Sequence, residues 1–347
     1  MQKKVMLGMS GGIDSAMSAH VLKNMGYDVT AVNCCFYKSG ADSEKAVEDA
    51  ARAAEKLNLP FEVFDLRKPF YEKVIENFID VYKKGGTPNP CIVCNKNLKF
   101  GAMLDLALER GFDYIATGHY ARIEKDENSG RYLLRKGADP IKDQSYVLYC
   151  LTQHQLSHTL FPLGDFSKDE VKSRVSEMEL VRDKGESQDI CFVPDGDYAA
   201  FIEKETGINF PEGDFVTTDG RVLGTHKGII RYTVGQRKGL GLALPAPMYV
   251  KEKDTENNRV VLCSNENLFT TELYAEDINL ITCDRLDLPL RVKAKVRYKH
   301  AEQWATVTQV DDYLLHIVFD EPQRAIAKGQ SVVLYSDDYV VGGGTII

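Results

Sequence analysis

The sequence has no run of apolar residues long enough to cross a bilayer, which takes about 18 or more in succession. The apolar stretch that follows the N-terminal Met-Gln-Lys-Lys is too short for a secretory signal peptide. The composition is otherwise that of a globular protein, with 44% hydrophobic and 27% charged residues among 347. We therefore expect a cytoplasmic enzyme of two or three domains that does not contact a membrane.

An excess of positive charge is also absent. The formal net charge of −8 argues mildly against a general nucleic-acid binder, although a local basic surface would overrule that average. The eight cysteines have irregular spacing, unlike a secreted disulfide framework, and only one CxxC pair occurs. Reduced thiols, a metal site or redox chemistry fit this pattern better than structural disulfides.

Short strand patterns alternate with helical patterns over the first 120 residues. The predicted strands are 3–8, 28–33, 61–66 and 113–117, and the predicted helices between them include 43–57 and 70–83. This alternation predicts an α/β domain with a doubly wound parallel sheet and a ligand site at the carboxyl ends of the strands. Residues 8–15 and 118–122 lie at that edge.

The rest of the chain has a different pattern. Short helices and turns dominate from about 155 to 265, and period-2 segments at 291–298, 304–310, 313–319 and 331–335 predict a C-terminal antiparallel β-barrel. We predict a first domain over 1–155, with 180–195 folding back onto it, a small α+β adaptor over 156–265, and a β-barrel over 266–347.

The stretch SGGIDS at 10–15 sits between the first predicted strand and a helix, where backbone N–H groups bind anions. It lacks the lysine of a Walker loop and the GxGxxG of a dinucleotide fingerprint. It resembles the PP-loop of the ATP pyrophosphatases, which hold the β,γ-pyrophosphate of ATP as a leaving group. Asp14 is a candidate Mg²⁺ ligand, since Mg²⁺ prefers carboxylate and phosphate oxygens.

The only CxxC lies in TPNPCIVCNKNLKF, residues 87–100. The apolar pattern after Cys94 predicts a helix that starts near Asn95. A thiol near a helix N-terminus and beside Lys96 would have a lowered pKa and favour the thiolate. Half of a zinc site and a dithiol redox pair are alternatives, although no second CxxC completes a four-cysteine zinc site.

The cations Arg291, Lys293, Lys295, Arg297 and Lys299 alternate with apolar residues in RVKAKVRYKH. On a strand they share one face, where like charges repel unless acids or a polyanion offset them. This favours a phosphate-binding face, and Arg237 and Lys238 add two cations in a Gly-rich and Pro-rich loop.

An ordered set of motifs carries a family resemblance along nearly the whole chain. These are SGGIDS, TPNPCIVCNKNLKF, ATGHYAR (116–122), KDQSY (142–146), SQDICF (187–192), YTVGQRKGLG (232–241) and FDEPQRAIAKGQS (319–331). Together they resemble the tRNA-specific 2-thiouridylases. The resemblance implies that ATP adenylates the C2 oxygen of the wobble uridine with pyrophosphate release. A cysteine persulfide then delivers sulfur to C2.

The resemblance also implies roles for individual residues. Cys191 would carry the persulfide, and Cys94 would be the paired nucleophile that forms a disulfide with it. The implied ATP-binding residues are Gly8, Met9, Ser10, Gly11, Gly12, Ile13, Asp14, Ser15, Cys34 and Gly118. The implied tRNA-contacting residues are Asn89, Pro90, Cys91, His119, Lys142, Asp143, Gln144, Arg297, Tyr298 and Gln330. The implied partners are tRNAs with Lys, Glu or Gln anticodons and a persulfide-donating cysteine desulfurase or relay protein.

Cys91 departs from the pattern, since many members have Asp there. Cys91, Cys94 and Cys191 are candidate ligands of an iron–sulfur cluster with one open iron. Two other functions stay open: a different PP-loop ligase, which would need no cysteines, and a metal- or redox-responsive RNA-binding module, which would not use ATP.

Overall fold

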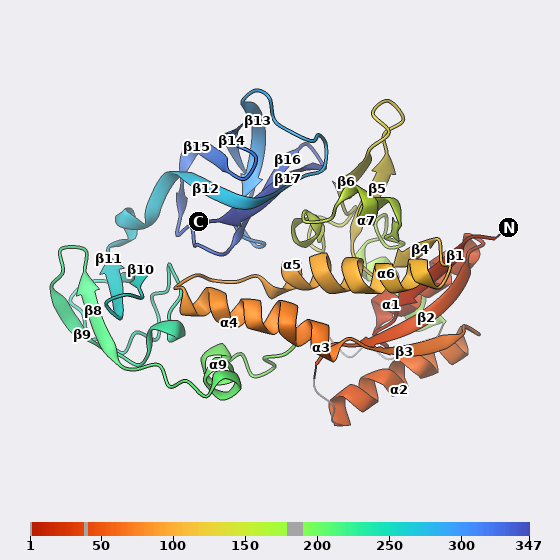
Figure 1. The fold of residues 1–347 in the computed structure, drawn as a ribbon, viewed down its shortest axis with the longest axis horizontal. Coiled ribbons are helices and arrows are strands. Elements are labelled where there is room, and N and C mark those ends of the chain that lie inside the picture. The colour runs from red at the N-terminus through yellow and green to blue at the C-terminus, as the bar shows by residue number, and fades with distance from the viewer. Residues whose placement is uncertain (1, 38–40, 179–189) are drawn as a thin grey trace.

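The computed structural model describes residues 2–37, 41–178 and 190–347, which form three regions (Figure 1). None of the helices in these ranges combines the length and the apolar character needed to cross a bilayer.

The first region contains a parallel sheet of five strands in the order β3-β2-β1-β4-β7. The strands are β1 (Lys4–Gly8), β2 (Asp28–Cys35), β3 (Phe61–Asp65), β4 (Tyr114–Ala116) and β7 (Thr159–Leu160). The four predicted strands are present, with small shifts at their ends. The fifth strand, β7, has only two residues, which is too short for a hydrophobic periodicity to identify it from the sequence.

Alternate residues of β1 bury against opposite faces of the sheet. Val5 and Leu7 pack against helices on one face, and Met6 packs with Met103 and Leu104 on the other. The predicted doubly wound arrangement is therefore confirmed. The helices of this region are α1 (Ile13–Asn24), α2 (Ala41–Lys56), α3 (Arg67–Phe70), α4 (Glu76–Lys83), α5 (Pro90–Cys94), α6 (Met103–Glu109), α7 (Gln153–Ser157) and α8 (Lys168–Glu177). A π-helical stretch, Tyr71–Ile75, joins α3 to α4, and another, Asn95–Ala102, joins α5 to α6.

The residues just after 155 still pack with the first region. Strand β7 extends the parallel sheet, and Val171 and Val175 of α8 bury their side chains in the same core as Ala16 and Met17 of α1. The spacing of four residues between the two valines places them on one helix face. The predicted domain limits, 155/156 and 265/266, stay predictions.

The central region contains helix α9 (Tyr198–Thr206) and a four-stranded sheet in the order β10-β11-β8-β9. Its strands are β8 (Gly213–Thr217), β9 (Val222–His226), β10 (Tyr249–Asp254) and β11 (Arg259–Cys263). The α+β prediction for this part of the chain is confirmed, and residues 232–248 form the expected irregular loop.

The C-terminal region is a closed antiparallel barrel, because β12 pairs with both β15 and β17. Its strands are β12 (Phe269–Leu280), β13 (Leu290–Lys295), β14 (Gln303–Gln309), β15 (Leu315–Arg324), β16 (Ser331–Ser336) and β17 (Tyr339–Ile346). A hairpin from the first region, β5 (Ala121–Lys125) and β6 (Tyr132–Lys136), contacts the barrel through a pairing of Arg135 in β6 with Tyr339 in β17.

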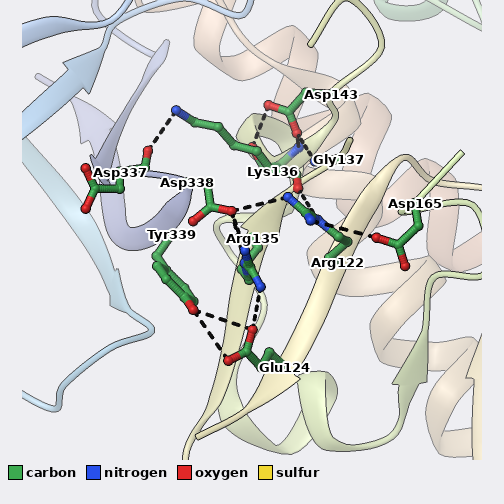
Figure 2. Close-up of polar contacts among 11 residues, drawn as sticks. Arg122, Glu124, Arg135, Lys136, Gly137, Asp143, Asp165, Asp337, Asp338 and Tyr339 are labelled. Carbon is green, nitrogen blue, oxygen red and sulfur yellow. Dashed lines mark hydrogen bonds and ion pairs between the residues drawn. The ribbon is translucent and has the colours of Figure 1, made fainter. Parts of the chain in front are cut away.

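Charged side chains fix this hairpin to the barrel. Figure 2 shows Arg122 of β5 and Arg135 of β6 converging on Asp338, with nitrogen–oxygen distances of 3.2 and 2.7 Å. Lys136 forms a further ion pair with Glu302, at 2.7 Å. Since β5 directly follows Tyr120, the barrel is anchored to the chain that leaves the carboxyl end of β4.

Candidate active site

The loop between β1 and α1 has a shape that depends on one glycine. Gly11 has a φ of +74°, and a Cβ atom there would lie 2.8 Å from the backbone nitrogen of Ala50 in α2. The Ser15 hydroxyl donates to the Gly12 carbonyl at 3.0 Å and accepts from the Ser10 N–H at 3.3 Å. Because α1 begins at Ile13, the unpaired N–H groups of its first turn face the same loop and favour an anion.

Two side chains from distant parts of the chain bind Asp14. Lys168 places Nζ 2.7 and 2.8 Å from the two carboxylate oxygens, and the Tyr120 hydroxyl donates to Oδ1 at 2.7 Å. A Cβ atom at Gly118 would lie 3.0 Å from the Asp14 Cβ, so a residue without a side chain lets this segment approach. The Asp14 side chain is still 34% exposed. One carboxylate beside substrate phosphates is a usual protein contribution to Mg²⁺ binding, and Asp14 fits that role.

A cavity of about 920 Å³ lies beside this loop. The predicted site residues that line it are Gly8, Met9, Ser10, Asp14, Ser15, Cys34, Gly118, His119, Gln144 and Cys191. Gly11, Gly12 and Ile13 shape the turn and do not line the cavity. The structure thus brings much of the predicted ATP site and one predicted catalytic cysteine to a single space.

Sequence reasoning missed Lys99, which also lines the cavity. It favoured Lys96, whose side chain is exposed. A π-helical stretch that starts at Asn95 explains why Lys99 and not Lys96 lies near Cys94. In a π-helix, residues five apart lie one turn above each other, and Lys99 is five residues after Cys94. A π-helical turn has no simple sequence signal, so the sequence alone could not identify Lys99 as a residue of the site.

The prediction of a lowered pKa for Cys94 was wrong. The helix begins at Pro90 and not near Asn95, with Asn89 as the capping residue, so Cys94 lies inside the helix and is 9% exposed. Burial raises the pKa of Cys94 to about 11, and the charge of Lys99 lowers it in part. The sequence did not show that an apolar core would cover this thiol.

Cys191 is exposed at the cavity and, like Cys94, is a free thiol. Desolvation raises the pKa of Cys191, the neighbouring Cys91 raises it further, and the charge of Lys99 lowers it. Burial also raises the pKa of Cys34, to about 12. Residues 187–189 of the SQDICF motif lie outside the described residues.

The three candidate ligands of an iron–sulfur cluster lie near one another but do not form a metal-holding group as the structure describes them. Cys91, Cys94 and Cys191 influence one another electrostatically. Within residues 2–37, 41–178 and 190–347, however, no group of three or more His, Cys, Asp or Glu side chains is placed to hold a metal ion.

Several of the implied tRNA contacts also have structural partners. Asn89 accepts from the Ile92 N–H at 3.4 Å and caps α5, while Pro90 is its buried first residue and Cys91 is exposed. His119 is buried, its ring bonds to the Thr117 hydroxyl at 2.7 Å, and burial places its pKa well below the usual value. His119 is therefore neutral.

The KDQSY segment forms a second polar cluster. The Asp143 carboxylate accepts from the Gly137 N–H at 3.0 Å and from the Ser145 hydroxyl at 2.8 Å. Gln144 lines the cavity and accepts from the Tyr120 N–H at 2.9 Å. Lys142 precedes them in the same turn, after Asp139.

The barrel places its predicted residues differently. Strand β13 ends at Lys295, so only the first three cations of the predicted basic face lie on the strand, and Arg297 and Tyr298 lie in the turn beyond it. The Tyr298 hydroxyl donates to the Asp143 carbonyl at 3.1 Å. The Gln330 amide donates to the carbonyls of Thr87 and Pro88 at 3.0 and 3.2 Å, which fixes the loop before α5.

Comparison with known families covers all three regions. Residues 3–195 match the family described as "tRNA methyl transferase HUP domain". Residues 199–264 match "tRNA methyl transferase PRC-barrel domain", and residues 270–346 match "Aminomethyltransferase beta-barrel domain".

Curated relatives align over the full length. The tRNA-specific 2-thiouridylase MnmA of Clostridioides difficile is 52% identical, with 100% of this chain and 98% of the relative covered. That of Acetivibrio thermocellus is 49% identical, with 99% of each covered. Among solved structures, the U34-tRNA thiolase NcsA of Methanococcus maripaludis is 20% identical, with a TM-score of 0.35. The match covers 58% of this chain and 66% of the thiolase chain, and it is too weak to support an inference. On the full-length identity, the chain belongs to the family of the tRNA-specific 2-thiouridylases MnmA.

Proposed function

We propose that the protein catalyses the ATP-dependent 2-thiolation of the wobble uridine of tRNA, in the cytoplasm. The observation that carries the proposal is the shared cavity, in which both ends of the loop, residues 8–10 and 14–15, face the same space as Cys191. An ATP-activating loop and a nucleophilic thiol in the same cavity favour sulfur transfer over the methyl transfer named in the family descriptions.

In the first step the loop holds the β,γ-pyrophosphate of ATP. The N–H groups at the start of α1 and the hydroxyls of Ser10 and Ser15 bond to the leaving pyrophosphate. Asp14 would hold Mg²⁺, which neutralises phosphate charge when bound. The uridine C2 oxygen forms a bond to the α-phosphorus, the bond to pyrophosphate breaks, and C2 becomes open to attack.

In the second step Cys191 supplies the sulfur. Because Cys191 is exposed, a cysteine desulfurase or relay protein can load it with a persulfide. The terminal sulfur bonds to C2 and AMP leaves. The Cys94 thiolate then attacks the Cys191 sulfur, the persulfide bond breaks, and 2-thiouridine and a Cys94–Cys191 disulfide result. A thiol reductant restores the two cysteines.

The RNA would lie across the mouth of the cavity and the barrel. Cys91, at the exposed start of α5, and the neighbouring Asn89 and Pro90 are proposed to lie beside the target base. Lys142, His119 and Gln144 line its approach. The substrates implied by the family are tRNAs with Lys, Glu or Gln anticodons.

Nucleoside analysis tests the proposal directly. The protein is incubated with ATP, Mg²⁺, a persulfide donor and unmodified tRNA, and 2-thiouridine is measured after digestion. We expect product with the wild type and with Cys283→Ser, a control in the barrel, and none with Cys191→Ser. Full activity of Cys94→Ser and Cys191→Ser would favour a different PP-loop ligase. A lack of tRNA-dependent AMP and pyrophosphate would favour an RNA-binding module.

A further inference from the structure

The loop between α4 and α5, residues 84–89, is held largely by bonds from outside its own region. Residues 86–89 form neither helix nor strand, so their backbone groups need partners elsewhere. The barrel supplies some of these partners. The Thr87 N–H donates to the Lys328 carbonyl at 2.7 Å, in addition to the bonds from Gln330 described above. The loop is thus joined to the barrel before it enters α5.

A lysine of the central region holds the same loop. Lys253 of β10 donates from Nζ to the Gly86 carbonyl oxygen at 3.0 Å. The backbone of β10 also packs closely there, because a Cβ atom on Gly85 would lie 3.2 Å from the Lys253 carbonyl oxygen. Lys253 Nζ lies 5.4 Å from the centre of the Tyr82 ring, which stacks on Tyr198 of α9. The end of α4, the loop and the central region therefore meet at this ammonium group.

Within the described parts of the chain, the ammonium group of Lys253 has no carboxylate within 4.0 Å. Burial lowers the pKa of Lys253 to about 8. Removing a charge from water costs free energy, and an apolar side chain of similar volume would fill the same space without that cost. What the charged group adds is a directional bond to one carbonyl, so its role concerns the position of the loop.

The loop leads directly into the segment that is proposed to lie beside the target base. Asn89, at the end of the loop, caps α5 through its side chain and so determines where the helix begins. Cys91 lies in the exposed first turn of that helix. Pro88 and Pro90 restrict their own backbone and that of the residue before each of them. The stretch is therefore stiff, and a displacement of Gly86 would be passed on to Cys91.

We propose that Lys253 is a positioning residue for the target uridine: its bond to Gly86 fixes the start of α5 next to the base. The proposal rests on the proposed function, which places Asn89, Pro90 and Cys91 beside that base. It gives the central region a part in the reaction, because the region then sets where the base is presented to the cavity. Phosphate contacts usually supply most of the affinity for a nucleic acid. Loss of the lysine should therefore reduce turnover and leave tRNA binding in place.

Hydrogen exchange measures the anchor without any substrate. Backbone exchange of the peptide that covers 84–90 is followed by mass spectrometry in the wild type, Lys253→Met, Lys253→Arg and Lys251→Met. Lys253→Met should increase exchange in this segment by about tenfold, since the loop loses one of its bonds and opens more often. Lys253→Arg keeps a charged donor and should keep the protection. Lys251 is exposed on the same strand, so Lys251→Met changes the net charge equally and should leave exchange unchanged.

Steady-state kinetics then tests the effect on the reaction. For tRNA-dependent AMP formation, Lys253→Met should have a kcat about tenfold lower than the wild type, because a misplaced base reacts more slowly. The Kd for unmodified tRNA should stay within about twofold of the wild-type value. Lys253→Arg should restore kcat. A general weakening of the fold would instead lower the unfolding midpoint in urea and weaken tRNA binding as well.

The two measurements together decide the proposal. Unchanged exchange in Lys253→Met, or faster exchange with an unchanged kcat, would overturn it. Equal changes in Lys251→Met would overturn it as well, since net charge would explain both. If Lys253→Met does not fold, a reduced kcat with wild-type exchange in Lys253→Arg overturns the proposal. A wild type that binds tRNA but forms neither AMP nor 2-thiouridine would contradict the proposed function alone, because exchange of the loop needs no substrate.

Discussion

Lys168 Nζ lies 2.7 and 2.8 Å from the carboxylate oxygens of Asp14, although 154 positions separate the two residues. The pair joins the first residue of α8 to the first turn of α1. Ser167 caps α8 reciprocally with Glu170, and so fixes where the helix begins and where Lys168 lies. The acidic residue of the SGGIDS loop is therefore positioned by a helix that the loop's own sequence does not reveal.

Replacing Lys168 with Met should reduce ATP activation. The substitution leaves Asp14 with Tyr120 but without its counter-charge, so the carboxylate loses its orientation. We expect tRNA-dependent AMP formation to fall by about 10- to 100-fold, or roughly 1.4–2.7 kcal/mol of transition-state stabilisation. Steady-state kinetics with ATP as the varied substrate measures this loss.

The exposed Lys172 provides a control on the same helix, since Lys172→Met changes the net charge equally. A double-mutant cycle with Asp14→Asn should give a coupling energy of about 0.5–3 kcal/mol. Additive effects of the two substitutions would contradict a functional pair.

The fold was largely predictable, because it follows from local periodicity. Strands of period two and helices of period 3.6 identified the parallel sheet and the barrel. The hairpin β5–β6 was not predicted as part of the barrel, because its attachment depends on Arg122 and Arg135 meeting Asp338 more than 200 positions away. Pairing between distant segments leaves no periodic signal in either one.

The place of the anion-binding loop was predictable from local residues, whereas the chemistry of the Cys94 thiol was not. The glycines and serines of the loop carry local information, because an anion-binding turn needs them at that spacing. The pKa of Cys94 depends on the apolar side chains that cover it and on Lys99. Such burial comes from tertiary packing, which the sequence around CIVC does not contain.

Neighbouring glycines of the loop should tolerate alanine differently. Gly11→Ala would need a positive φ and would place Cβ 2.8 Å from the Ala50 nitrogen, whereas at Gly12 the nearest atom is the Ser10 hydroxyl oxygen at 3.5 Å. We expect Gly11→Ala to lower the free energy of unfolding by about 1–3 kcal/mol and Gly12→Ala to change it by less than about 1 kcal/mol. Urea denaturation without nucleotide measures both. Equal losses would mean that the contact with α2 does not constrain the loop.

Lys99 should set the pH dependence of sulfur transfer. Because the pKa of Cys94 is about 11, only a small fraction is thiolate at neutral pH, and the rate should rise with pH toward that value. Lys99→Met removes the charge that lowers the pKa, so the profile should move to higher pH, and the rate at pH 8 should fall by about three- to tenfold. Lys96→Met, an exposed change of equal charge on the same helix, should leave the profile in place. Single-turnover transfer from persulfidated enzyme, followed from pH 6.5 to 9.5, separates the two variants. Identical shifts would assign the effect to net charge and not to the position of Lys99 in the cavity.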